Sequence, residues 1–153
     1  MKNFRKAMGW AALVSTVALA QPQAPVSVPT ASSDVLQAEA SQFRRTGTYA
    51  EVEALCQSWA QRYPEVVRCL NMGQTAEGRT MRAMVVTRTG ALTPEQADRA
   101  NIPVVLAIAG THSGEIDGKD AGLMLIRDWL KKPPTNDPLQ HQVLVFVPVF
   151  NLD

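Results

Sequence analysis

The stretch that decides the fold is Pro103-Val-Val-Leu-Ala-Ile-Ala109, followed at once by Gly110-Thr-His-Ser-Gly-Glu-Ile-Asp-Gly-Lys-Asp120. The first half is a continuous apolar run with β-branched residues, which predicts a strand covered on both faces in a mostly parallel sheet. Gly110 ends the run, and the polar residues after it leave the carboxyl end of the strand, where open α/β sheets usually build their sites. The sequence therefore predicts an α/β domain with a functional site after this strand.

His112 and Glu115 lie three positions apart in the polar segment. An imidazole nitrogen and a carboxylate oxygen are common zinc ligands, and two histidines with one glutamate leave a coordination position open for water. The alternative is a loop histidine beside a solvated glutamate, because a bare HxxE pattern also occurs by chance. The buried strand before the pair and the helix after it favour zinc binding by His112 and Glu115.

The other predicted elements surround this segment. They are a helix at 49–62, antiparallel strands at 66–72 and 81–87, a short helix from Pro94 to about Ala100, a helix capped by Asp117, and a strand from about 142 that Pro148 limits. Capping-box patterns precede the first helix, at Thr48 and Glu51, and the short helix, at Thr93 and Gln96. This order predicts an α/β fold with a mixed sheet flanked by helices and truncated at its C-terminal side.

The two last strands are expected to be parallel, because a strand–helix–strand connection of this length is almost always a right-handed crossover. Such a crossover brings His112 and Asn151-Leu-Asp153 to one edge of the sheet. His141 begins its strand at the opposite edge, roughly 25 Å away at about 3.3 Å per residue. We therefore interpret His141 as a surface loop histidine and not as a third ligand.

The first twenty residues predict export. Three basic residues precede a largely apolar run at 7–20 that ends in Ala18-Leu-Ala20, which is typical of a secretory signal peptide with its cleavage site. A membrane span needs roughly 20 apolar residues, so no stable membrane insertion is expected after cleavage. We expect a periplasmic or secreted protein.

The exported part is expected to divide in two. Residues 21–45 are rich in Pro, Ala, Ser and Gln without a clear period, which indicates a flexible leader, and 46–153 form the domain. Loss of the signal peptide lowers the formal net charge from +1 to −2 and leaves no basic stripe. Nucleic acid is therefore not an expected partner. Because the sequence stops just after an apolar strand, we expect a fragment of a longer domain.

Cys56 and Cys69 lie thirteen positions apart in the exported part. An oxidising compartment permits a disulfide. In the loop-entropy model, a disulfide that closes a loop of this size stabilises the folded state by about 3 kcal/mol. Burial as two free apolar thiols is the alternative. The sequence leaves both open.

Four motifs occur in order along the chain: Arg62-Tyr-Pro64, Gly73-Gln-Thr-Ala-Glu-Gly-Arg79, Gly110-Thr-His-Ser-Gly-Glu115 and Asn151-Leu-Asp153. Together they resemble the zinc metallocarboxypeptidase family, the carboxypeptidase A-like peptidases, from about Thr46 to Asp153. The resemblance implies that His112 and Glu115 are the first two zinc ligands. It also implies that the third ligand and the general-base glutamate follow Asp153, so the catalytic residues are unknown here and this fragment alone is expected to be inactive.

The activity implied by the resemblance is hydrolysis that releases a C-terminal amino acid from a peptide. Two departures bear on it, since digestive members carry Arg where this chain has Gly114, and Pro is common where it has Leu152. The first departure leaves the substrate preference open. Zinc-dependent deacylation of N-acyl amino acids is one alternative, and a secreted binding domain without catalysis is another.

The remaining polar residues near these motifs have simpler interpretations. Glu77 and Arg79 are predicted as solvated turn residues, and Asn151 and Asp153 as turn formers. Asp117 and Asp120 are predicted as acids at a helix start, with orientation of His112 as the alternative.

Overall fold

The computed structural model describes residues 34–133, 135 and 137–153. The predicted signal peptide and residues 21–33 of the predicted leader lie outside these residues. The elements in chain order are α1 (Gln37–Ala40), α2 (Tyr49–Arg62), β1 (Val67–Gln74), β2 (Thr80–Val86), α3 (Pro94–Arg99), β3 (Val104–Ile108), α4 (Asp117–Lys131), the 3-10 turn η1 (Pro138–Gln140) and β4 (Val143–Val147). No helix in the described part of the chain has the length and apolarity needed to cross a membrane.

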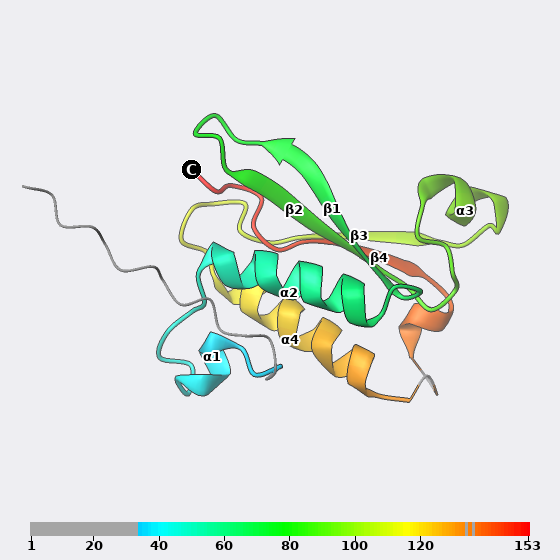
Figure 1. Ribbon diagram of the computed structural model, residues 1–153, viewed down its shortest axis with the longest axis horizontal. Helices are drawn as coiled ribbons and strands as arrows, with labels where there is room; N and C mark the ends of the chain where they lie inside the picture. Colours follow the sequence, from blue (N-terminus) through cyan, green and yellow to red (C-terminus); the bar gives the residue numbers. More distant parts are fainter. Residues whose placement is uncertain (1–33, 134, 136) are drawn as a thin grey trace, which may run out of the picture.

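The sheet is mixed, as predicted, with the strand order β1-β2-β4-β3. β2 pairs with β1 and β4 in antiparallel register, whereas β3 and β4 are parallel. Figure 1 shows α2 and α4 side by side along one side of this sheet, with α3 beyond one end of the strands. The parallel pair is what brings the segments after β3 and β4 to the same edge of the sheet.

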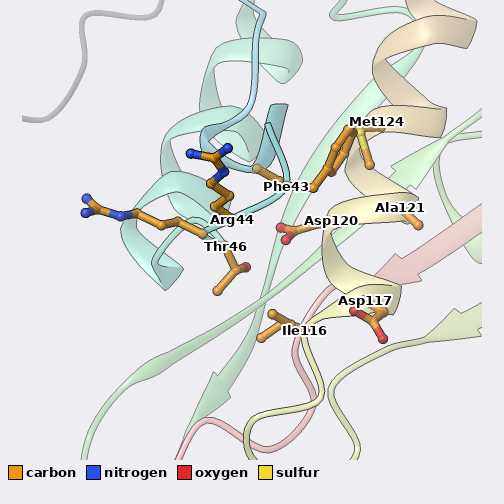
Figure 2. Close-up of a pocket in the computed structure, with 10 residues that line it drawn as sticks. Phe43, Arg44, Thr46, Ile116, Asp117, Asp120, Ala121 and Met124 are labelled. Carbon is orange, nitrogen blue, oxygen red and sulfur yellow. The ribbon is translucent and has the colours of Figure 1, made fainter. Parts of the chain in front are cut away.

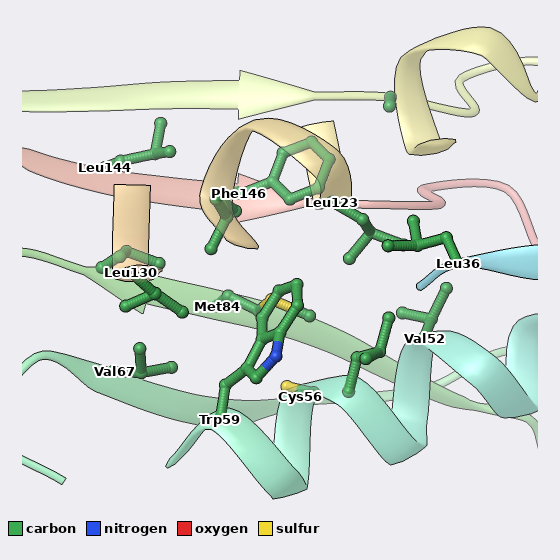
Figure 3. Close-up of a cluster of buried hydrophobic side chains, with 14 of the residues drawn as sticks. Leu36, Val52, Cys56, Trp59, Val67, Met84, Leu123, Leu130, Leu144 and Phe146 are labelled. Atoms are coloured by element: carbon green, nitrogen blue, oxygen red, sulfur yellow. The ribbon is translucent and has the colours of Figure 1, made fainter. Parts of the chain in front are cut away.

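The main core lies between the sheet and the helices α2 and α4. Trp59 of α2 is fully buried against residues of the sheet and of α4, and it lies at the centre of the cluster in Figure 3. The helices contribute residues at helical spacing and the strands alternate residues, as expected for one apolar face each. The buried members from these elements are Val52, Leu55, Cys56, Trp59, Val67, Met84, Val86, Leu123, Ile126, Leu130, Leu144 and Phe146.

A smaller cluster covers part of the opposite face. Val85 and Val143 alternate with the main-core residues of their strands and pack against Ala91 and Ala97, the latter on α3. The capping box predicted for this short helix is present, because the Thr93 hydroxyl accepts from the Gln96 amide. The second face of the sheet is therefore covered over parts of β2 and β4.

β3 differs from the prediction of a strand buried on both faces. It has a neighbour, β4, on one side only, and four of its five side chains are 42% to 60% exposed. The apolar sequence correctly predicted a strand, but a strand's composition does not identify the segment that covers it. Within the described residues, this edge of the sheet remains open.

The folded part begins earlier than predicted, which corrects the boundary at residue 46. Leu36 is 1% exposed and belongs to the main core, and Ala38 of α1 is 2% exposed. An ion pair joins Glu39 of α1 to Arg127 of α4, and another joins Asp34 to Arg62. A single helical turn is too short to show a hydrophobic period, so the sequence pattern indicated only a leader.

Helix α2 has the predicted bounds, but its predicted capping box is absent. The Thr48 side chain makes no capping hydrogen bond. The Glu51 carboxylate instead accepts from the backbone amide of Gln37 at 2.7 Å. Glu51 thus holds the start of α1, a contact across fourteen positions that a local motif does not reveal.

Cys56 and Cys69 form a disulfide, which decides between the two alternatives left open by the sequence. It joins α2 to β1 with a Cα–Cα distance of 5.3 Å. The bridge ties the main helix to the outer strand of the sheet.

Candidate metal centre

The predicted site lies where the chain passes from β3 to α4. The backbone amides of Phe150 and Asn151 donate to the carbonyl oxygens of Ala109 and Gly110, both at 2.9 Å. The segments that follow β3 and β4 therefore run together at one edge of the sheet, as the parallel pairing predicts (Figure 1). The polar loop after Gly110 projects from this edge.

His112 and Glu115 face each other in this loop. Nδ1 of His112 lies 2.9 Å from Oε1 of Glu115, and the Glu115 amide donates to the His112 carbonyl at 3.2 Å. The two side chains are 78% and 62% exposed. Tetrahedral zinc with ligand bonds of about 2.1 Å holds its donor atoms roughly 3.4 Å apart, so a small opening of this pair fits one ion. The residues present thus fit two positions of a zinc site.

A third ligand is not found in the described part of the chain, where no group of three or more His, Cys, Asp or Glu side chains could hold a metal. His141 precedes β4, whose first residue Val143 pairs with Val104, while the site follows Ile108 at the other end of β3. The prediction that His141 lies at the opposite edge is confirmed.

The loop is confined at both ends by close packing. Gly110 has φ +57° and a Cβ built on it would lie 3.0 Å from Cα of Val149, so only glycine suits this crossing. A Cβ on Gly118, in the first turn of α4, would lie 2.9 Å from Cβ of Ala109. The sequence showed these glycines but not the neighbours that make them necessary.

Asp120, in the first turn of α4, does not orient His112, because its carboxylate is paired elsewhere. Asp120 is buried and forms an ion pair with Lys119, whose Nζ also donates to the Gly47 carbonyl at 3.1 Å. Asp117 is exposed, and it is the first residue of α4 and not its cap, because Ile116 holds the capping position. The alternative role predicted for these acids is wrong for Asp120.

A cavity of about 230 Å³ lies beside this helix start (Figure 2). Its lining comes from the segment before α2, including Phe43 and Arg44, and from α4, including Asp117 and Asp120. Lys119 already neutralises Asp120, and neither predicted zinc ligand lines the cavity. It is therefore separate from the candidate metal centre.

The hairpin loop between β1 and β2 reaches the same edge, where Glu77 and Arg79 are exposed, as predicted, and also contact the segment after β4. Nη1 of Arg79 lies 3.0 Å from the Leu152 carbonyl oxygen and 2.5 Å from Oδ1 of Asp153, and the Glu77 amide donates to Oδ2 at 3.1 Å. Burial acts to raise the pKa of Asp153, but hydrogen bonds from Thr75, the Glu77 amide and Arg79 together lower it below the usual 3.8. The sequence did not predict the pairing of Arg79 with Asp153, because the two residues are 74 positions apart and belong to no common local motif.

The fold is a mixed α/β domain in which an exposed imidazole–carboxylate pair, His112 and Glu115, lies at one edge of the sheet. The family model for zinc carboxypeptidases matches residues 52–153. The chain belongs to this family, whose members depend on zinc and hydrolyse peptides. None of the curated proteins compared with the chain is significantly similar to it.

Several solved structures share this fold. Bovine thrombin-activatable fibrinolysis inhibitor, in complex with tick carboxypeptidase inhibitor, is 17% identical with a TM-score of 0.58, over 71% of this chain and 32% of that one. Carboxypeptidase A of Helicoverpa armigera is 21% identical with a TM-score of 0.57, over 78% and 30%. A metallo-carboxypeptidase of Burkholderia cenocepacia is 25% identical with a TM-score of 0.50, over 67% and 27%. The chain thus spans about a third of the length of these structures.

Proposed function

We propose that this chain is the N-terminal part of the catalytic domain of an exported zinc carboxypeptidase, in which His112 and Glu115 bind the zinc. The observation that carries the proposal is the convergence of His112 Nδ1 and Glu115 Oε1 at 2.9 Å, within the region that matches the family. The chemistry of the pair supports zinc, because nitrogen and carboxylate ligands together suit this ion.

When bound, zinc supplies an activated water of lowered pKa and polarises the scissile carbonyl. His112 contributes a neutral nitrogen, and Glu115 contributes a negative charge that offsets part of the charge of the ion. The exposure of both side chains leaves their outer side accessible to a substrate. We place the third ligand and the general base in a longer chain, a placement supported by the limited share of the solved relatives that this sequence covers.

The proposed substrate is a peptide with a free C-terminal carboxylate. Gly114 has no side chain, so the loop carries no cation between the two proposed ligands. Its φ of +88° is a conformation that residues with a side chain rarely adopt. A site without that cation is compatible with a second substrate class, the N-acyl amino acids. Deacylation is therefore the second candidate function.

Export is supported by two independent observations. The sequence of residues 1–20 has the pattern of a signal peptide. The Cys56–Cys69 disulfide requires an oxidising compartment to persist, which the periplasm or the exterior provides. We propose that the protein acts outside the cytoplasm.

A substrate comparison with the full-length protein tests this function. Two peptides of one sequence, one with a free C-terminal carboxylate and the other amidated, are compared with N-acetyl amino acids, before and after removal of zinc by a chelator. We expect release of the last residue from the free peptide only, loss of activity with the chelator, and recovery with added zinc. Hydrolysis of N-acetyl amino acids alone supports the deacylase, and inactivity on every substrate of a zinc-loaded protein supports the binding domain.

A further inference from the structure

The tip of the β1–β2 hairpin is tied to the segment that follows β4. Arg79 contacts both the backbone carbonyl of Leu152 and the carboxylate of Asp153, and the other oxygen of that carboxylate accepts from the Glu77 amide. The second terminal nitrogen of Arg79 lies 2.5 Å from Oε2 of Glu77. The guanidinium group thereby joins two parts of the chain that are far apart in sequence.

The same segment supports the loop of the candidate metal centre. The amides of Phe150 and Asn151 donate to the carbonyls of Ala109 and Gly110, which are the last residues before that loop. His112 follows Gly110 by two positions. A displacement of 150–153 therefore reaches the ligand loop through two backbone hydrogen bonds.

Both ends of the loop that carries His112 are closely packed against neighbouring segments. At Gly110 the two segments cross with no room for a Cβ, and at Gly118 the start of α4 lies directly against Ala109. The loop is fixed at its start by the contact of Gly110 with Val149 and at its end by the contact of Gly118 with Ala109. The position of His112 therefore depends on where these segments lie. Supports of this kind around metal ligands commonly change metal affinity when they are removed.

We propose that Arg79 is a positioning residue for the metal centre, acting through Leu152, Asp153 and the backbone pairs at 109–110 to hold the loop that carries His112 and Glu115. The inference rests on the proposed zinc site but concerns a residue outside it. The ion pair itself is exposed, with 46% of the Arg79 side chain and 26% of the Asp153 side chain accessible. Exposed pairs contribute little to overall stability, so the effect on the metal is separable from an effect on folding.

The planar fork of arginine is needed because a single group serves a carbonyl and two carboxylates in different directions. Lysine supplies one point charge and cannot reproduce this arrangement. Arg79→Lys therefore keeps the charge but loses part of the contacts, whereas Arg79→Gln removes the charge. Arg99→Gln is the matched control, since Arg99 is an exposed arginine on α3, away from the site edge (Figure 1).

The test measures zinc dissociation constants of the full-length protein and these variants by competition with a chelator, with the absorption spectrum of the cobalt-substituted protein as a second readout. We expect Arg79→Gln to weaken zinc binding about 10-fold and to shift the cobalt spectrum, Arg79→Lys to have a smaller effect, and Arg99→Gln to match the wild type. The double variant Arg79→Gln, Asp153→Asn is expected to bind zinc no more weakly than Arg79→Gln alone. Hydrogen exchange at the amides of Phe150 and Asn151 is expected to accelerate in Arg79→Gln without metal.

Wild-type zinc affinity and an unchanged cobalt spectrum in Arg79→Gln overturn the positioning role, even if the variant melts at a lower temperature. If Arg79→Gln does not fold, Arg79→Lys decides by the same measurement. A wild-type protein whose zinc affinity is unchanged by His112→Ala overturns the proposed function and the positioning role together. The two failures are thus distinguished by the variant that departs from expectation, which is His112→Ala for the proposed function and Arg79→Gln for the positioning role alone.

Discussion

Gly122 of α4 lies against the ring of Phe146 on β4, and a Cβ built on it would overlap with Cζ of that ring. Gly122→Ala gains about 1 kcal/mol of helix propensity. We expect the variant nevertheless to be less stable by about 1–3 kcal/mol, because the helix or the buried ring must move. Urea unfolding measures the free energy difference.

The double variant with Phe146→Leu separates the two contributions. Leucine removes the ring atoms that the new methyl group would meet, so the cost of Gly122→Ala should fall in this background. A Gly122→Ala protein that is more stable than the wild type would show that α4 does not pack as closely as described.

At the level of elements, α1 is held by charges in addition to Leu36. Hydrogen bonds from Arg127 and Arg62 lower the pKa values of Glu39 and Asp34 below their usual 4.5 and 3.8. A carboxylate with a lowered folded-state pKa contributes stability above its unfolded pKa and loses it as pH falls through the folded value. We therefore expect α1 to loosen on acidification from about pH 5 to about pH 3.

Amide chemical shifts of Leu36 and Ala38 during a pH titration follow this change. Glu39→Gln, which cannot ionise, is expected to show weaker docking at neutral pH and a smaller response to acid. Glu65→Gln removes an exposed carboxylate elsewhere. In this control, the amide shifts of Leu36 and Ala38 should respond to acid as they do in the wild type. An identical acid response in the wild type and Glu39→Gln would exclude the Glu39–Arg127 pair as the cause.

The elements could largely be predicted from local signals. The bounds of α2, the capped start of α3 and the antiparallel hairpin of β1 and β2 follow from periodicity, caps and glycines. The exposure of β3 and the docking of α1 could not be predicted, because each depends on which distant segment lies alongside. The failed capping box at Thr48 has the same cause, since Glu51 contacts Gln37 instead.

At the scale of the whole molecule, the parallel pairing of β3 and β4 brings the segments that follow these two strands together at one edge of the sheet. The sequence predicted the edge at which His112 and Glu115 lie, because the position of this pair follows from one strand–loop–helix unit. It did not predict the contribution of Arg79, whose partners lie 73 and 74 positions away. Local patterns thus indicate the proposed ligands, whereas the contacts of Arg79 depend on segments that are distant in the sequence.

The open edge of β3 also belongs to this scale. Val104, Leu106 and Ile108 are 48% to 60% exposed, a large apolar surface for a folded protein. The chain spans about a third of the solved relatives. A longer chain that continues the sheet would bury this edge and supply the remaining groups of the proposed site.

The zinc content of the purified full-length protein tests the central claim most directly. Metal analysis of the wild type, His112→Ala, Glu115→Ala and His141→Ala should give one zinc per chain for the wild type and for His141→Ala. His112→Ala should lose the metal, and Glu115→Ala should bind it at least 10-fold more weakly, as expected for removal of a ligand or its support. Full zinc occupancy with unchanged affinity in His112→Ala would contradict the assignment of His112 and Glu115 as the metal ligands.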